Sequence, residues 1–391
     1  MKVLFVFDTF LLKNSDDNYY GMTLNNDFFK ERYLKIFDKL VVSTRMKNIE
    51  LNKGDISGYK IVNSDKVLVK PVLSYNSIPD VIINRNKILE ELEKLVNEVD
   101  SVIIRMPSVL GILASKICKK KNKKYLIEMV ACPWDGYINH ESKFGKIVAP
   151  FMWFYTKKVV YDSKNVLYVT NDFLQKRYPT KGHTCACSDV ILRKIDRSSL
   201  INRFHKIEKT DFKNFSIGTV ANVELKYKGH EYVFKAIAKL KKKDINCIYY
   251  LIGNGDNKRL RNLAKKLKIS DNIIFVGSLT NKDVLKFLEK IDVYIQPSLQ
   301  EGLPRALIEA MSVGVPVVAS NAGGIPELID NEYIFRKKRV NEICNILCSL
   351  DSTKLKHMSE DNIKKSKKYE KEILDKVRNE FYLKSLKEDK K

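Results

Sequence analysis

Short apolar runs rich in β-branched residues alternate with helical patterns along the whole chain. In the first half the predicted strands are KVLFVFD (2–8), KLVVSTR (39–45), SVIIRM (101–106), KYLIEMV (124–130) and NVLYVT (165–170). In the second half they are FSIGTV (215–220), CIYYLIG (247–253), NIIFVG (272–277), VYIQPS (293–298) and PVVAS (316–320). Regular alternation of strand and helix predicts parallel sheets that helices cover on both faces.

Two such series predict an α/β protein with two doubly wound parallel-sheet domains. The predicted domains span residues 1–192 and 215–368, and the charged segment 193–214, with little apolar periodicity, is the predicted linker. Residues 369–391 form a predicted helical tail that packs back on the amino-terminal domain. Its docking stripe is expected to consist of Tyr369, Ile373, Val377, Phe381 and Leu383. Ligands of such sheets bind at the carboxyl ends of the strands, so the predicted site is the cleft between the domains.

Composition limits the protein class. The chain has 391 residues. It contains no run of 18 uninterrupted apolar residues, so no transmembrane helix is expected. The first residues, MKVLFVFDTF, are typical of a first strand and not of a signal peptide. Seven cysteines without a signal peptide indicate reduced thiols in the cytoplasm. His183, Cys185 and Cys187 share one face of a predicted strand, but no second ligand pair follows at zinc spacing, so no metal site is expected.

The net charge of +24 comes from lysines spread along the chain. It indicates either an ordinary solvated surface or attraction to anionic phospholipid or a phosphorylated substrate. The chain lacks the motifs typical of nucleic-acid binding, so no nucleic-acid partner is expected. The apolar and basic run APFMWFYTKKVV (149–160) predicts either a buried helix or a contact with the inner face of the cytoplasmic membrane. The expected location is cytoplasmic, with peripheral membrane attachment.

The segment EGLPRALIEAMSVGVPVVASNAGGIPELI (301–329) contains two glutamates and two glycine turns. Gly302 permits a tight turn, and Pro304 suits the first position of a helix. The turn at Gly323 and Gly324 predicts a second helix start. Two helix N-termini at one sheet edge predict a ligand with a diphosphate.

The two glutamates are candidate ligand-binding groups. Glu301 stands at the mouth of the first predicted helix, and Glu309 about two turns inside it. A carboxylate accepts two hydrogen bonds, which suits vicinal hydroxyls, so the pair can hold two rings of one ligand. Alternatively, Glu309 makes a local salt bridge and Glu301 is a solvated loop residue. The spacing alone leaves both interpretations open.

The segment 301–329 closely resembles the signature of glycosyltransferase family 4. Sequence elements upstream of this segment match the family pattern in the same order. These elements are IGTV, KYKGHEYVFKAI, LIGNGD, FVGSL and DVYIQPSLQEGLP. The first half is similar to bacterial surface-polysaccharide transferases through RMPS (105–108), ACPWDGYINH (131–140) and YVTNDFLQKRYPT (168–180). The resemblance implies a retaining, nucleotide-sugar-dependent hexosyltransferase of the GT-B fold, in which two Rossmann-like domains face each other across a cleft.

The resemblance also implies individual roles. Glu301 would contact the transferred sugar, Glu309 would hold the nucleotide ribose, and Lys228 would contact the diphosphate unless it is merely a surface lysine. Arg305 would face either phosphate or solvent. The expected donor-binding residues are Gly21, Gly253, Gly302, Leu303, Pro304, Arg305 and Glu309.

Two departures from the family pattern affect the expected site. The family usually has a diphosphate-binding arginine five positions before the lysine, and here Val223 takes that place, so Lys226 or Arg305 is a possible substitute. The family often has a histidine directly after the fourth or fifth strand, which this chain lacks. His140 is the expected catalytic replacement, with Asp135 as the alternative, or else His140 is a structural loop histidine. The expected acceptor-binding residues are Trp134, Asp135 and Arg105.

The implied reaction needs neither metal nor cofactor, because basic side chains and helix N-termini stabilise the departing nucleoside diphosphate. The expected partners are a nucleotide-sugar donor and a glycan or lipid-linked glycan acceptor. The alternatives are another GT-B enzyme, such as a nucleotide-sugar epimerase or a phosphorylase, and a non-catalytic nucleotide-sugar-binding protein. Val223 is the feature that favours the non-catalytic alternative.

Overall fold

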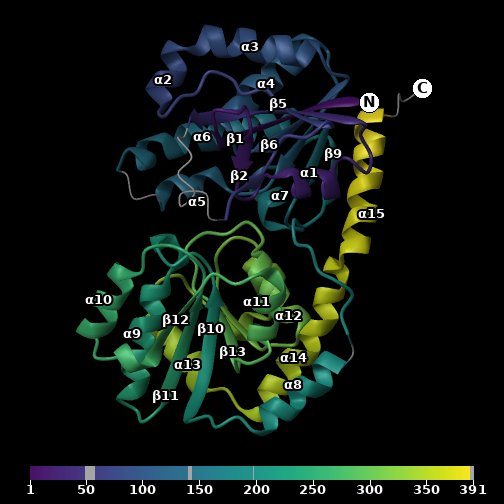
Figure 1. Ribbon diagram of the computed structural model, residues 1–391. Coiled ribbons are helices and arrows are strands. Elements are labelled where there is room, and N and C mark those ends of the chain that lie inside the picture. The colour runs from purple at the N-terminus through teal and green to yellow at the C-terminus, as the bar shows by residue number, and fades with distance from the viewer. Residues whose placement is uncertain (49–57, 140–142, 197, 388–391) are drawn as a thin grey trace.

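The computed structural model has two α/β domains, one above the other in Figure 1, with the helices α14 and α15 along one side. It describes residues 1–48, 58–139, 143–196 and 198–387. Each of the ten apolar runs predicted as strands overlaps an observed strand. Among the described helices, none combines the length and the apolar character that crossing a bilayer requires.

The amino-terminal sheet is parallel in its main part. Its order is β5 (Val67–Val69), β3 (Lys39–Asn48), β1 (Lys2–Lys13), β6 (Ser101–Met106), β7 (Tyr125–Met129), β8 (Asn165–Tyr168) and β9 (His183–Ala186). Two short antiparallel strands, β2 (Tyr19–Gly21) and β4 (Lys60–Ile61), extend it beside the second half of β1. The helices of this domain are α1 (Asn26–Arg32), α2 (Ile78–Ile83), α3 (Arg85–Asn97), α4 (Val109–Lys120), α5 (Pro133–Ile138), α6 (Lys143–Tyr161) and α7 (Phe173–Arg177).

The second sheet is entirely parallel. Its order is β12 (Ile273–Gly277), β11 (Asn246–Ile252), β10 (Asn214–Val220), β13 (Val293–Gln296), β14 (Val317–Ser320) and β15 (Ile334–Phe335). Its helices are α8 (Ser198–Glu208), α9 (His230–Lys241), α10 (Lys258–Lys266), α11 (Asn281–Leu288), α12 (Arg305–Ser312), α13 (Val340–Cys348) and α14 (Ser352–Ser366). The strand order reverses between β10 and β13, as in Rossmann-like sheets, and ligands bind at this switch point. The predicted α/β class with two doubly wound domains is confirmed.

The predicted linker 193–214 differs from the structure, because half of it forms the helix α8. This helix packs through Ile207 and Arg203, which are buried. The Arg203 guanidinium donates to the carbonyl oxygens of Ile291 at 2.7 Å and Leu288 at 3.1 Å. A search for apolar periodicity misses this helix because one of its main packing residues is an arginine whose stem is buried.

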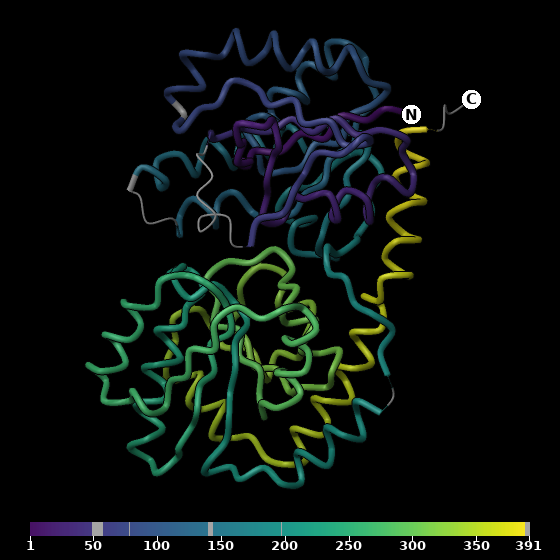
Figure 2. The backbone as a smooth tube through the Cα atoms, viewed as in Figure 1, coloured from purple at the N-terminus to yellow at the C-terminus, as the bar shows by residue number. Residues whose placement is uncertain are grey.

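The carboxyl-terminal tail forms α15 (Lys371–Tyr382), which lies against the amino-terminal domain, and the chain crosses between domains twice (Figure 2). The crossings lie side by side, since the backbone N–H of Lys371 donates to Leu192 O at 2.9 Å. The buried residues of α15 are Leu374, Arg378 and Tyr382. The predicted stripe through Ile373 and Val377 is therefore wrong, because polar partners select the docking face.

Those polar partners form a buried ion network around Glu128. Its carboxylate accepts hydrogen bonds from Tyr33 at 2.9 Å, from Arg105 at 2.6 Å and from Tyr382 of α15. Asp189 pairs with Arg105 and with Arg32. Burial raises the pKa of Glu128, but the charges of Arg32 and Arg105 outweigh it and hold the pKa below its usual value. The network joins α1, β6, β7 and α15.

We expect Arg105→Met to destabilise the amino-terminal domain by about 3–5 kcal/mol, because it leaves the buried carboxylate of Glu128 and the half-buried carboxylate of Asp189 with too little positive charge. Urea unfolding at neutral pH measures this. The folded pKa values of Glu128 and Asp189 are depressed. The stability they confer is therefore complete above the usual values of 4.5 and 3.8 and is lost as the pH falls through the lower folded values. The difference between variant and parent should shrink in acid.

Lys60→Met is the matched control, because Lys60 and Asp27 are paired at 2.9 Å with both side chains exposed. Its loss should be below about 1 kcal/mol. Equal losses for Arg105→Met and Lys60→Met would contradict a structural role for the buried network.

Candidate active site

The carboxyl edge of the second sheet brings Lys228 and Glu301 together. β10 leads into the 3-10 turn η1 (Lys226–Lys228), and β13 leads into the loop that carries Glu301. Lys228 Nζ lies 2.7 Å from Glu301 Oε1, and the side chains are only 19% and 12% exposed. Because the pair is partly shielded from water, its attraction is stronger than that of a surface ion pair.

Glu301 is held in place by its own strand. Ser298 Oγ and Gln296 Nε2 donate to Glu301 Oε1 at 2.7 and 3.1 Å, and Tyr294 donates to Gln296. With Lys228, three donors converge on one carboxylate oxygen. Among the described residues, we find no donor to the second oxygen, Oε2, so it is available to a ligand hydroxyl. Sequence reasoning missed Ser298 and Gln296, although their places three and five residues before Glu301 were a usable signal.

The first glycine turn, at Gly302, packs closely against the amino-terminal domain. A Cβ atom on Gly302 would lie 2.3 Å from Val130 O, so only glycine fits. Leu303 and Pro304 are buried behind it. The prediction that Pro304 is the first helical residue is wrong by one position, because its ψ of 113° is extended and α12 begins at Arg305. The first amides of α12 still have no intrahelical acceptor.

Glu309 lies about one turn inside α12, not two, because it is only four residues after Arg305, where the helix begins. Burial raises the pKa of its carboxyl group, and the charge of the exposed Arg305 offsets only part of this. No hydrogen bond from the described residues reaches the carboxylate. Glu309 is half-buried and neither of its carboxylate oxygens is fully enclosed without a partner, so both oxygens are available to ligand hydroxyls.

The second glycine turn does not open a helix, which corrects the prediction of two helix N-termini aimed at one ligand. Residues Ile325–Glu327 form a single 3-10 turn, η3. The chain then makes another short turn, η4 (Asn331–Tyr333), and reaches β15 at Ile334, so a helix has no room. One helix N-terminus, that of α12, remains at this place.

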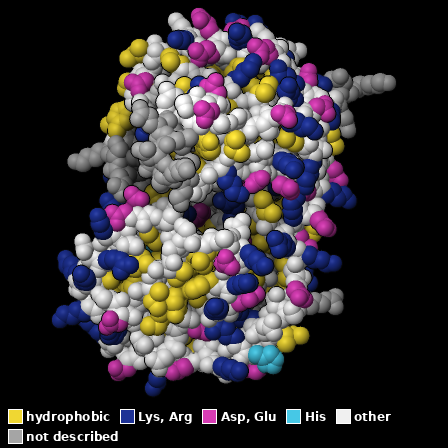
Figure 3. Space-filling view, viewed as in Figure 1, with side chains coloured by type: hydrophobic (Ala, Val, Ile, Leu, Met, Phe, Trp, Pro, Cys, Tyr) yellow, Lys and Arg dark blue, Asp and Glu magenta, His cyan; other side chains and the backbone are white. Residues whose placement is uncertain are grey.

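Glu327 of this turn contacts the other domain. Its carboxylate accepts the backbone N–H groups of Asn171 at 2.6 Å, Asp172 at 3.1 Å and Phe173 at 2.6 Å, at the start of α7. A Cβ atom on Gly324 would lie 2.9 Å from Thr170 Cγ2. The anionic side chain suits the positive end of a helix. The segment thus connects the two domains through hydrogen bonds. The molecular surface is hollowed between the domains (Figure 3).

The loops after β10 and β11 contact each other closely. A Cβ atom on Gly253 would lie 2.1 Å from Ala221 O, and the backbone N–H of Val223 donates to Asn254 O at 2.9 Å. Val223 is buried, so it packs the loop where the family pattern has an arginine. His230, which sequence reasoning missed, is also buried, and burial lowers its pKa to about 4. It therefore adds no charge beside Lys228 at neutral pH.

Two expected acceptor-binding residues lie on α5 at the carboxyl end of β7. Trp134 is half-buried, and Asp135 is paired with Arg177 of α7 at 3.4 Å. The expected donor residue Gly21 ends β2, where a Cβ atom would lie 2.1 Å from Leu24 O, so a tight turn requires it. His140, the expected catalytic histidine, lies outside the described residues.

Arg105 does not fit the expected acceptor contact. Its guanidinium is paired with the buried carboxylate of Glu128 and the half-buried carboxylate of Asp189, so its donors are used inside the domain. The motif search could not see this, because both partners are far away in the sequence.

A polar cluster that the sequence did not reveal lies where β1 stops pairing with β6, after Val6. Asp8 accepts from Tyr75 at 2.7 Å and from the backbone N–H of Val109 at 2.9 Å, and it pairs with Arg45 at 2.8 Å. This is the switch point of the amino-terminal sheet, so the cluster is a candidate wall of the acceptor site.

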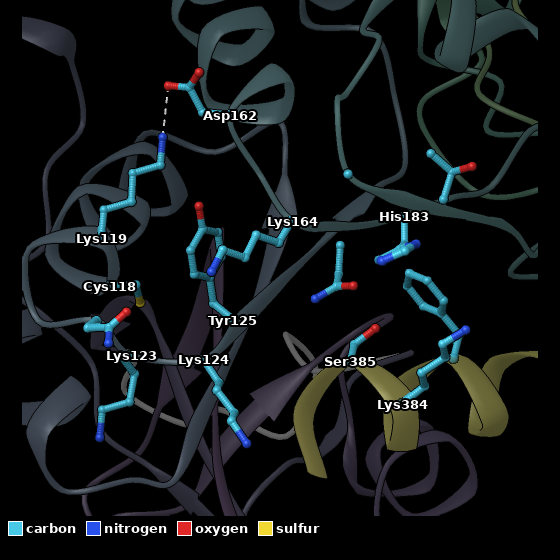
Figure 4. A pocket seen from close by; sticks show the side chains of 15 residues that line it. Cys118, Lys119, Lys123, Lys124, Tyr125, Asp162, Lys164, His183, Lys384 and Ser385 are labelled. Carbon is cyan, nitrogen blue, oxygen red and sulfur yellow. Dashed lines mark hydrogen bonds and ion pairs between the residues drawn. The ribbon is translucent and has the colours of Figure 1, made fainter. Parts of the chain in front are cut away.

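A cavity of about 650 Å³ lies at the opposite edge of the first sheet. It is lined by the first residues of three strands, Tyr125, Asn165 and His183, together with Lys164 and Lys384 (Figure 4). Substrates of parallel α/β sheets bind at the carboxyl ends of the strands, so this cavity is not the candidate active site.

The Glu327 contact predicts a measurable change in domain closure. We expect Glu327→Gln to increase the radius of gyration in small-angle X-ray scattering. The neutral amide has one acceptor oxygen instead of two, and losing a hydrogen bond to a charged group costs about 1.5–3 kcal/mol, or at least about tenfold in the closed population. Glu332→Gln is the control, because Glu332 is exposed and pairs with Lys354 of its own domain. Identical scattering by the Glu327→Gln variant and the parent would contradict the assignment.

Comparisons with known proteins place this architecture in a family. The family model "Glycosyl transferases group 1" matches residues 201–364. Protein CapJ of Staphylococcus aureus is 35% identical over 370 residues, which cover 94% of this chain and 90% of CapJ. The amylovoran biosynthesis glycosyltransferase AmsK of Erwinia amylovora is 38% identical over 90 residues, which cover 21% of this chain and 22% of AmsK.

Among solved structures, HepE of Anabaena in complex with UDP-glucose is similar with a TM-score of 0.64 and 16% identity, over 97% of this chain and 98% of HepE. At this identity the likeness shows the fold, and it confirms the predicted GT-B arrangement of two Rossmann-like domains. With the extensive match to CapJ and the matching family model, the chain belongs to the group 1 glycosyltransferases.

Proposed function

We propose that this glycosyltransferase moves a hexosyl group from a nucleotide-sugar donor to a glycan acceptor, with retention of anomeric configuration. The observation that carries the proposal is the meeting of Lys228, Glu301 and the amino end of α12 at one sheet edge, with Lys228 Nζ 2.7 Å from Glu301 Oε1. A cation, a carboxylate and free amides suit the phosphate, the hydroxyls and the leaving oxygen of a sugar diphosphate.

Each group has one role in this proposal. Lys228 shifts toward the diphosphate when the donor binds, while Glu301 keeps its bonds from Ser298 and Gln296 and contacts the transferred sugar through Oε2. Glu309, whose carboxylate lacks a donor among the described residues, binds the ribose hydroxyls.

The reaction proceeds without a covalent enzyme intermediate. As the glycosidic bond breaks, negative charge grows on the departing diphosphate, and Lys228 and the first amides of α12 stabilise it. The acceptor hydroxyl attacks from the face that the leaving group departs, and a phosphate oxygen takes its proton. Because Val223 replaces the usual arginine, Lys228 carries most of the positive charge, and Arg305 at the start of α12 or Lys226 of η1 is the substitute.

The relatives favour a role in surface polysaccharide synthesis. AmsK is named for amylovoran biosynthesis, and HepE was crystallised with UDP-glucose. The proposed donor is accordingly a nucleoside diphosphate sugar, and the acceptor is a lipid-linked glycan at the inner face of the cytoplasmic membrane, where the enzyme is peripherally bound. The net charge of +24 favours an anionic membrane surface.

The two glutamates should differ in kind when replaced. Glu301 contacts the ring that flattens in the transition state, so Glu301→Gln should lower turnover far more than donor affinity. Glu309 holds a ribose that does not change during reaction. Glu309→Gln should therefore weaken the binding of the donor and of the free nucleoside diphosphate alike, by about 1.5–3 kcal/mol. Calorimetry and single-turnover rates measure both effects.

Parent-like binding and rates in both variants would overturn the proposed site. A Glu309→Gln variant that loses rate but keeps full nucleotide affinity would show that the two roles are misassigned. Donor binding by the parent without any transfer or hydrolysis would favour the non-catalytic alternative.

We also predict metal-independent turnover, because Lys228 and the amino end of α12 supply the positive charge that a divalent ion supplies in other transferases. The rate in excess EDTA should stay close to the rate with magnesium. A collapse to background that manganese restores would contradict this prediction.

A further inference from the structure

Helix α6 (Lys143–Tyr161) has an apolar face on each side. Its inner face packs on the amino-terminal domain through Val148, Met152, Val159 and Val160, all buried. This stripe alone satisfies the usual requirement of a helix that covers a sheet. The outer face of such a helix is normally polar, as in α3, where Lys87, Glu90 and Lys94 are not buried.

The outer face of α6 is instead apolar and aromatic. Ile147, Phe151 and Phe154 are 63, 63 and 56% exposed, and their spacing of four and three residues puts them on one stripe. Tyr155 and Tyr161 are also exposed beside this stripe. Scattered exposed apolar residues are ordinary, but a continuous stripe of large side chains marks an interaction surface.

Lysines border this stripe. The sequence of α6, KFGKIVAPFMWFYTKKVVY, contains four lysines and no acidic residue. Lys116 of α4 places Nζ 5.5 Å from the ring centre of Tyr155, and Lys181 places Nζ 4.8 Å from that of Tyr161. Aromatic rings with a polar edge suit the lipid headgroup region, and flanking ammonium groups attract anionic phospholipid.

We propose that the outer face of α6 is the surface that docks this protein on an anionic bilayer. The alternative occupant, a second copy of the chain, is disfavoured because a symmetric dimer would bring the lysine borders of both copies together. The reason for membrane docking rests on the proposed function, in which the acceptor is a lipid-linked glycan. α6 and α5 lie on the same side of the amino-terminal domain (Figure 1), so docking through α6 brings the candidate acceptor site near lipid-linked glycans.

The test is co-sedimentation of the full chain with phosphatidylglycerol–phosphatidylcholine vesicles and with pure phosphatidylcholine vesicles. The parent should bind the anionic vesicles, and binding should weaken as salt rises. Phe151→Ser with Phe154→Ser should reduce binding at least about tenfold at every salt concentration, because apolar insertion is lost. Lys146→Glu with Lys158→Glu should reduce it mainly at low salt.

Ile201→Ser is the matched control, because Ile201 is 60% exposed on α8 of the other domain, and it should bind like the parent. Donor affinity, measured without vesicles, should be the same in the Phe151/Phe154 variant as in the parent. This result would show that the variant is folded. Lys228→Ala should lose turnover and still bind vesicles, so failure of the proposed chemistry is distinguishable from failure of docking.

Equal vesicle binding by the parent and the Phe151/Phe154 variant would overturn the proposal. So would parent binding to neither vesicle type. A parent dimer in analytical ultracentrifugation that the Phe151/Phe154 variant dissociates, without vesicle binding, would assign the stripe to a second copy instead.

Discussion

The arrangement of this molecule depends on one close approach between its domains. A side chain on Gly302 would collide with Val130 O, 2.3 Å from the position of its Cβ atom, and one on Gly324 would crowd Thr170. Backbone therefore meets backbone where the second sheet faces the first. This contact brings the carboxyl edges of both sheets to a common space, and Glu327 holds it by accepting three amides of the opposite domain.

Charged groups serve two different purposes in the two domains. Glu128 is buried and accepts from Tyr33, Arg105 and Tyr382, and both oxygens of the half-buried Asp189 are in ion pairs with Arg32 and Arg105, so these groups join α15 to the amino-terminal sheet and do not face a ligand. Glu301 uses one carboxylate oxygen inside the protein, and Glu309 has no donor among the described residues. Carboxylate oxygens that have neither a donor nor an ion-pair partner among the described residues, at a sheet switch point, distinguish the candidate site from the structural network.

Part of the candidate site could be predicted from the sequence. Local sequence determines the turns and the strand ends, so Lys228, Glu301 and Glu309 could be found from motifs on neighbouring loops of one sheet. Arg105 also follows the motif pattern, but its partners Glu128 and Asp189 are 23 and 84 residues away, and their charges decide its role. Glu327 and the Asp8 cluster depend on contacts of comparable length and left no local signal.

The sequence by itself determined the α/β class, the ten main strands and the edge of the sheet that carries the site, because alternating apolar periods and glycine turns are local properties of the chain. Tertiary structure decided the rest. It turned the supposed linker into α8 around the buried stem of Arg203, and it selected the face of α15 that carries Arg378 and Tyr382. It also left the apolar outer stripe of α6 exposed. In each case the free energy comes from partners distant in sequence, which the residue pattern of a single segment does not contain.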